Sequence, residues 1–207
     1  MTNVGTSVFA LKYKDGVMIA ADVQVGTGSW LKHKDFPRMA TIGEEAILAC
    51  SGEMSDFQNI KKMLDVKYEE DFVQSDGALF FHPKDYHNMV GNYQYKKRMK
   101  NDPVFVSAVI AGIDKKKKEV FLGCSDPHGL KLEKDYFITG LGNHYCGVIF
   151  ANNWRPDMSY AEAKQLVETC ARIMFIRDKK ALDKIQFSTI THAEGVKIGE
   201  AEKFNFS

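Results

Sequence analysis

The chain has 207 residues, of which 44% are hydrophobic and 27% are charged, and its formal net charge is +1. This balance is typical of a globular domain with a sizeable core, and the near-neutral charge excludes binding to nucleic acid or anionic membranes through bulk electrostatics. No stretch approaches eighteen uninterrupted apolar residues, and the first residues lack a secretory pattern, so we expect neither a membrane span nor secretion.

The first third of the chain predicts two β-hairpins followed by a helix. The first hairpin turns at Asp15-Gly16, a strong turn signal, and the second turns at Gly43-Glu44-Glu45. After Gly52, apolar residues recur at helical spacing, which predicts a helix over 55–67. The expected strands are 7–13, 17–22, 39–42 and 46–50.

The remainder predicts three more helices between further strands. One helix begins at Pro83, a favoured first helical residue, and ends near Asn101. Another follows Gly140-Leu141-Gly142 and ends near Asn153. The last begins with a capping box in which Ser159 and Glu162 satisfy each other's backbone amides. The expected strands are 104–113, 119–124, 136–139, 186–191 and 196–199.

Strand pairs that enclose helix pairs predict an α+β fold of four layers, an αββα sandwich. Two antiparallel sheets would be stacked between two helical layers. No linker or repeat interrupts the chain, so we expect residues 1–207 to form a single domain. Residues 1–5 would be a short N-terminal extension and residues 200–207 a short C-terminal tail.

The pattern of cysteine, histidine and glycine residues predicts neither a metal site nor a cofactor site. The four cysteines lie far apart in apolar segments, as in a protein of a reducing compartment, and the six histidines show no ligand spacing. Gly140-Leu141-Gly142 lacks the third glycine and the acidic residue of a dinucleotide-binding fingerprint.

Four segments carry a recognisable family pattern in chain order. They are GTSVFALKYKDGVMIAAD from Gly5, ACSGEMSDF ending at Phe57, TGLGNHYC from Thr139, and the capped helix that ends in Arg177-Asp178. In these segments the chain resembles the beta subunits of the proteasome core particle, which are N-terminal nucleophile hydrolases. The resemblance runs from Gly5 to about Gly199 and implies the four-layer fold of that family.

The resemblance also implies where a catalytic site would lie. In active members, cleavage after the residue matching Gly5 frees the amine of the residue matching Thr6. That amine then serves as the base for the threonine hydroxyl, because a hydroxyl is a weak nucleophile until a base takes its proton. Asp22 is retained sixteen residues after Thr6, and Gly52 matches the oxyanion-hole amide.

Three positions depart from the active pattern. Arg38 stands sixteen residues after Asp22, where active members have a lysine. Leu141 replaces a serine in the glycine turn, and Ala181, three residues after Asp178, replaces another. A guanidinium is effectively always protonated and cannot accept a proton from threonine. We therefore expect a non-catalytic chain that is uncut before Thr6, with Asp22 and Arg38 forming a structural ion pair.

Among the silent members, the chain resembles the beta-7 subfamily, called beta type-4 in mammalian naming. The resemblance implies a structural subunit that completes the beta ring between beta-6 and beta-1. It would contact alpha subunits and opposite-ring beta subunits and help join half-particles for ubiquitin-dependent degradation in the cytoplasm and nucleus. Some beta-7 subunits clamp the opposite ring with a long tail, which we expect to be short or absent here.

Two other functions remain open from the sequence. The first is an active threonine endopeptidase subunit that uses Thr6 and tolerates Arg38. The second is a free-standing binding protein that reuses the scaffold. For all three functions we expect no cofactor, no metal, no nucleic acid and no membrane.

Overall fold

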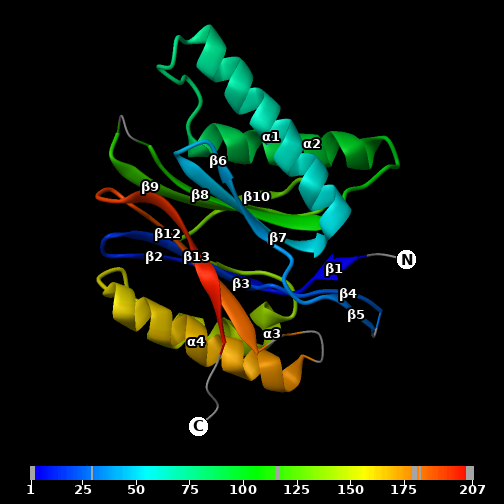
Figure 1. Cartoon of the computed structure of the whole chain (residues 1–207), viewed down its shortest axis with the longest axis vertical. Coiled ribbons are helices and arrows are strands. Elements are labelled where there is room, and N and C mark those ends of the chain that lie inside the picture. The colour runs from blue at the N-terminus through cyan, green and yellow to red at the C-terminus, as the bar shows by residue number, and fades with distance from the viewer. Residues whose placement is uncertain (1–2, 29, 115–116, 179–180, 182, 204–207) are drawn as a thin grey trace.

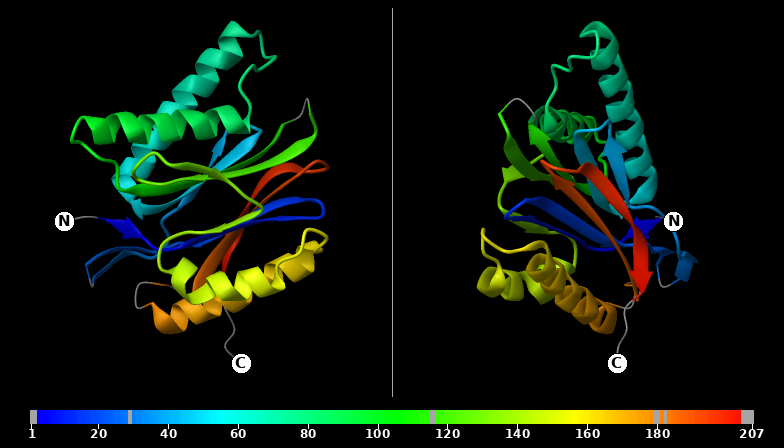
Figure 2. Two further views of the ribbon diagram at one scale, coloured as in Figure 1. Left: turned by 180° about the vertical axis from the view of Figure 1, so that it is seen from behind. Right: turned by 60° about the vertical axis from the view of Figure 1, so that its left-hand side comes forward.

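Two antiparallel sheets lie face to face between two pairs of helices in the computed structural model of the chain (Figure 1). The structure describes residues 3–28, 30–114, 117–178, 181 and 183–203. Figure 2, which turns the molecule, shows the same order of layers from behind and from the side. The predicted αββα sandwich is therefore confirmed.

The larger sheet contains eight strands in the order β10-β9-β8-β7-β1-β4-β5, with β6 paired to β7. Its strands are β1 (Val4–Gly5), β4 (Val25–Thr27), β5 (Trp30–His33), β6 (Met39–Ile42), β7 (Ala46–Glu53), β8 (Val106–Asp114), β9 (Glu119–Ser125) and β10 (Lys131–Glu133). Helices α1 (Met54–Gln74) and α2 (Pro83–Met99) cover its outer face. Their buried side chains pack on those of β7 and β8, among them Phe57 and Val90 against Leu48 and Ile110.

The smaller sheet contains five strands in the order β11-β2-β3-β12-β13. They are β2 (Val8–Tyr13), β3 (Gly16–Asp22), β11 (Tyr136–Ile138), β12 (Lys184–Thr191) and β13 (Gly195–Lys203). Helices α3 (Gly142–Asn153) and α4 (Tyr160–Arg177) cover its outer face. The alternation of side chains along β2 explains this packing: Phe9 and Leu11 face the helices, whereas Val8 and Ala10 face the other sheet.

The strands of the first hairpin pair as the sequence predicted, and Tyr13 lies opposite Gly16 across the turn. Gly16 is required there because a Cβ at this residue would lie 2.0 Å from the carbonyl oxygen of Ile190. The predicted capping box of α4 is also confirmed: Ser159 Oγ accepts from the Glu162 amide at 3.3 Å, and Glu162 Oε2 accepts from the Ser159 amide at 2.8 Å.

Helix α1 extends to Gln74, beyond the predicted end at 67. Glu69-Glu70-Asp71 interrupt the apolar period, and the contacts that continue the helix come from elsewhere in the chain. Asp71 is buried and accepts hydrogen bonds from the Phe80 and Phe81 amides at 2.9 Å. None of the helices within the described residues is long and apolar enough to cross a membrane.

Both expected terminal segments contain strands. Strand β13 runs to Lys203, which lies opposite Lys184, so residues 200–203 do not belong to a tail. Residues 204–207 lie outside the described part of the chain. At the other end, Val4 and Gly5 form β1, which pairs with both β7 and β4. A strand of two residues is too short to show an alternating pattern in the sequence. Only its hydrogen bonds to neighbouring strands make it a strand.

Candidate active site

Thr6 and Asp22 meet at one end of the sheet sandwich. Thr6 lies between β1 and β2, and Asp22 is the last residue of β3. The hydroxyl of Thr6 donates to Asp22 Oδ2 at 2.6 Å. The structure therefore brings together the two residues that the sequence placed sixteen positions apart.

Arg38 lies directly behind this pair and is completely buried. Its Nη1 forms an ion pair with Asp22 Oδ1, whose side chain is 9% exposed. Nη1 also lies 3.4 Å from the hydroxyl oxygen of Thr6. The predicted ion pair between Asp22 and Arg38 is confirmed, and it is a buried one.

The other terminal nitrogen of Arg38 bonds to three carbonyls in two backbone segments. Nη2 donates to the carbonyl oxygens of Thr6, of Ser7 at 3.2 Å and of Cys50 at 3.1 Å. Thr6 and Ser7 directly precede β2, whereas Cys50 belongs to β7, and these two strands lie in different sheets. Because guanidinium is a rigid planar donor, Arg38 stabilises the place where the two sheets meet.

The segment before Thr6 is built into the larger sheet. Gly5 lies opposite Gly52 of β7 on one side and opposite Val25 of β4 on the other. The carbonyl oxygen of Asn3 accepts from the Met54 amide at 2.8 Å, at the start of α1. While Thr6 stays joined to Gly5, its nitrogen is an amide and not a basic amine.

Gly52 is retained for a reason that does not require catalysis. Its φ is +109°, a conformation that side chains disfavour, and a Cβ there would lie 2.1 Å from the carbonyl oxygen of Phe105. Gly52 therefore allows the backbone of β7 to pass close to the backbone of Phe105, which directly precedes β8. Its presence is explained by backbone packing alone.

Leu141 has no polar atom to offer the site. It is half exposed and precedes the first residue of α3. The turn is held instead by Ser7, whose Oγ accepts from the Gly142 amide at 2.8 Å, and by Thr139, whose Oγ1 accepts from the Val8 amide at 2.9 Å. The sequence analysis missed these two hydroxyls, although both lie within the family segments.

Ala181 lies beside Thr6 without a hydroxyl. A cavity of about 20 Å³ adjoins Thr6, and its lining includes Asp22, Met174 and Ala181. That volume corresponds to about one water molecule. Asp178 ends α4, is buried, and accepts at its carbonyl from the Ala181 amide at 2.9 Å.

Cys50 is the other nucleophilic side chain close to the cluster. It is completely buried, and this burial raises the pKa of its thiol well above the ordinary value of 9.0, although the Arg38 charge acts in the opposite direction. A thiol attacks as its thiolate, so Cys50 is inert in this environment. Across residues 3–28, 30–114, 117–178, 181 and 183–203, no group of three His, Cys, Asp or Glu side chains could hold a metal ion.

Two stacked antiparallel sheets between helical layers, with a threonine and an aspartate at their end, define the fold of an N-terminal nucleophile hydrolase. A family model described as "Proteasome subunit" matches residues 2–190. The chain is 37% identical to "Proteasome subunit beta type-4" of Arabidopsis thaliana over 196 residues, which cover 95% of this chain and 78% of the relative.

Two further relatives carry similar names. The protein of Dictyostelium discoideum named "Proteasome subunit beta type-4" is 32% identical, with 98% of this chain and 83% of the relative covered. The "Probable proteasome subunit beta type-7" of Schizosaccharomyces pombe is 30% identical, with 93% of this chain and 74% of the relative covered. The chain belongs to the proteasome beta subunit family.

Proposed function

We propose that this chain is a catalytically silent beta subunit of type beta-7 in a eukaryotic proteasome core particle. It completes the beta ring between beta-6 and beta-1, contacts alpha subunits and opposite-ring beta subunits, and helps to join the half-particles. The particle works in the cytoplasm and nucleus, and other subunits cut the peptide bonds of its substrates. In the proposed role Gly5 and Thr6 stay joined.

The observation that carries the proposal is the environment of Arg38. Its guanidinium is already bonded to Asp22 and to three carbonyls, and it has no lone pair with which to accept the Thr6 proton. Asp22 accepts a hydrogen bond from Thr6, but taking that proton would leave the Arg38 charge buried beside a neutral acid. Breaking a buried ion pair costs about 3–5 kcal/mol, which opposes catalysis by this route.

The remaining groups do not supply a replacement base. Leu141 and Ala181 carry no hydroxyl through which a proton could be relayed, and the Thr6 nitrogen is an amide for as long as Gly5 and Thr6 stay joined. The contacts of Arg38 with Asp22 and with the three carbonyls stabilise the fold and do not activate a nucleophile. This is why we favour the silent subunit over an endopeptidase that uses Thr6.

Several faces of the molecule carry exposed apolar side chains that could contact neighbouring subunits. They lie on both outer helical layers and on the β4–β5 hairpin, and include Val73, Phe80, Val148, Ile176 and Trp30, which is 82% exposed. Trp30 belongs to β5, all of whose residues are exposed. In the proposed particle these side chains would be covered by neighbouring subunits.

A Thr6→Ala variant tests the proposal in assembled particles. The expected result is full incorporation and unchanged cleavage of acidic, basic and hydrophobic fluorogenic peptides, because no step depends on the hydroxyl. Thr6→Ser, which keeps the hydrogen bond to Asp22, is the matched control for any assembly defect. Loss of one peptidase activity in Thr6→Ala particles, with that activity retained in Thr6→Ser particles, would support the endopeptidase instead.

The same preparation distinguishes the free-standing binding protein. Size-exclusion chromatography of cell extract should place the chain with the very large particle. Recovery of most of the chain as a small species would contradict the proposal.

A further inference from the structure

Two buried thiols lie together between helices α3 and α4. Cys146 belongs to α3 and Cys170 to α4, and both are free and completely buried. Cys146 Sγ donates to the carbonyl oxygen of Cys170 at 3.5 Å, and the two thiols also form a hydrogen bond with each other. The other two cysteines, Cys50 and Cys124, belong to strands of the larger sheet and therefore lie in another layer.

The two thiols differ in how readily they ionise. The hydrogen bond with Cys170 lowers the pKa of Cys146 from its ordinary value of 9.0, although burial acts in the opposite direction. The same hydrogen bond raises the pKa of Cys170, and burial raises it further. A thiol attacks as its thiolate, so Cys146 is the nucleophile of the pair and Cys170 is the thiol beside it.

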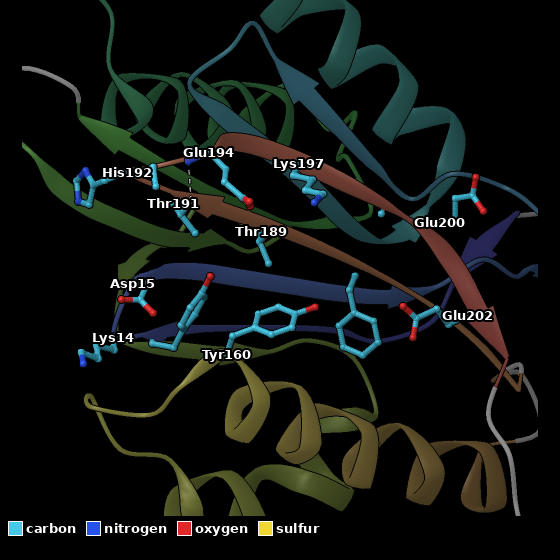
Figure 3. A pocket seen from close by; sticks show the side chains of 14 residues that line it. Lys14, Asp15, Tyr160, Thr189, Thr191, His192, Glu194, Lys197, Glu200 and Glu202 are labelled. Carbon is cyan, nitrogen blue, oxygen red and sulfur yellow. Dashed lines mark hydrogen bonds between the residues drawn. The ribbon is translucent and has the colours of Figure 1, made fainter.

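Helix α4 has several contacts that fix it on the smaller sheet. Figure 3, a close view of the groove beside this helix, shows two of the residues involved, Tyr160 and Glu202. The ring of Tyr160 packs on that of Tyr13 with the centroids 6.2 Å apart, and Lys164 forms an ion pair with Glu202 at 2.8 Å. The capping box fixes the first turn of the helix as well. We therefore expect Cys170 to stay in place when a neighbouring element moves.

Helix α3 has the features of a segment that opens locally. It is 12 residues long, contains Gly147 in its interior, and begins after Leu141, whose side chain cannot cap it. Within the described residues of α3, the first turn has no acidic side chain and the last turn no basic one, so the helix dipole is not complemented. Its outer side is open to solvent, since Tyr145 and Val148 are exposed. Opening of this short helix would expose Cys146.

We propose that Cys146 and Cys170 are a redox-sensitive pair that closes to a disulfide when α3 opens in the presence of hydrogen peroxide. The Cys146 thiolate attacks one peroxide oxygen and the O–O bond breaks. The sulfur becomes a sulfenic acid, and the departing hydroxide takes up the proton that Cys146 released. The sulfur of Cys170 then attacks the sulfenic sulfur, the S–S bond forms, the S–O bond breaks, and water leaves with the Cys170 proton. Two thiols and one peroxide thus give one disulfide and two waters.

The disulfide ties α3 to α4 and prevents α3 from opening. Because the two thiols already contact each other in the closed fold, the bond requires no new contact between the helices. In a reducing compartment such a disulfide is transient, so the pair would respond to oxidation and would not be a permanent crosslink. The inference does not depend on the proposed function, because it concerns α3 and α4 and uses none of the residues around Arg38.

Treatment of the native full-length chain with hydrogen peroxide tests the pair. The intact mass should fall by that of two hydrogen atoms and should be restored by dithiothreitol. Trypsin cuts after Lys164, so peptide mapping without reduction should find residues 135–164 linked to residues 165–172. Because a disulfide constrains the unfolded chain, the midpoint of urea unfolding should rise by about 1 M on oxidation.

Three variants assign the thiols. Cys146→Ala and Cys170→Ala should each abolish the linked peptides and the rise of the unfolding midpoint. Cys124→Ala changes a partly exposed thiol outside the pair and should leave both unchanged. Free Cys146 and Cys170 in the native chain, at a peroxide dose that oxidises the thiols of the urea-unfolded chain, would overturn the proposal.

Two further variants test the opening of α3. A Cβ at Gly147 would lie 3.4 Å from Asn143 Oδ1, a side-chain atom that can move, so Gly147→Ala fits and stabilises the helix. It should slow disulfide formation about fivefold, because the open state becomes rarer. Ala151→Gly, at an exposed residue of the same helix, should speed it about fivefold. Equal rates in the wild type and both variants would overturn opening of α3 as the route to the disulfide.

Discussion

The guanidinium of Arg38 lies directly against the backbone of Gly5. A Cβ at residue 5 would be 2.5 Å from Arg38 Nε and 3.1 Å from its Cδ. Neither atom is at a free end, because the terminal nitrogens of Arg38 are bonded to Asp22 and to three carbonyls. The glycine that precedes the threonine in active relatives therefore has a steric role in this chain.

Gly5→Ala should consequently destabilise the chain by about 1–3 kcal/mol, the usual cost of overpacking. Urea unfolding of the purified full-length chain measures this free energy. In a chain that already carries Arg38→Lys, Gly5→Ala should cost less, because a lysine side chain lacks the guanidinium bonds that hold Arg38 in place and can shift away from the new Cβ. Equal costs in the two backgrounds would refute the contact.

Arg38→Met removes the buried charge while keeping a long side chain. It leaves the buried Asp22 carboxylate without its counter-charge and three carbonyls without the Arg38 donor, although Thr6 still donates to Asp22, so we expect the free energy of unfolding to fall by about 3–5 kcal/mol. Proteolysis per assembled particle should stay unchanged. Asp22→Asn leaves the arginine unpaired, and the double variant should cost less than the sum of the single variants; additive costs would show that the pair is not coupled.

His87 should make stability depend on pH. It is 1% exposed on α2 and packs on the ring of Phe121. Burial lowers its pKa from the ordinary 6.5, so the unfolded chain binds this proton more readily than the folded chain. This contribution to stability is fully present above about pH 6.5 and is lost as the pH falls through the folded pKa.

The predicted loss of stability on acidification is tested by measuring the free energy of unfolding at about pH 7.5 and about pH 5. His87→Gln should show a smaller loss on acidification than the wild type, whereas His128→Gln, at an exposed site, should not differ from it. A His87→Gln chain that loses as much stability as the wild type would exclude His87 as the source.

Ser159→Ala should cost about 1 kcal/mol through loss of the α4 cap. The Glu162 amide would lose its acceptor, and the Glu162 carboxylate would keep its bonds to the backbone of residue 159 and to Arg155. Ser159→Asp retains an acceptor and should stay close to wild type in thermal unfolding. If alanine and aspartate behave alike, the cap does not stabilise α4.

Local signals made much of the fold predictable. Asp15-Gly16 defined the first hairpin, and Ser159 with Glu162 defined the start of α4. The last turns of α1 were not predictable, because they depend on Asp71 accepting from the Phe80 and Phe81 amides. Strand β1 was missed for the same reason: only its pairing with β7 and β4 makes it a strand.

The candidate site was predictable as a set of positions but not as a set of contacts. Spacing and resemblance brought together Thr6, Asp22 and Arg38. The fit of Gly5 against Arg38 and the bond from Gly142 to Ser7 require coordinates, because no local pattern encodes contacts between distant segments. The sequence also could not show that the ion pair is completely buried on the arginine side.

The most direct test is the intact mass of this chain from native particles, with and without a threonine-reactive epoxyketone. The account predicts a chain that is still joined across Gly5 and Thr6 and carries no inhibitor, while the catalytic subunits of the same particle are labelled. A chain that begins at Thr6 and carries the inhibitor would contradict it, since it would mean that Thr6 is activated despite Arg38.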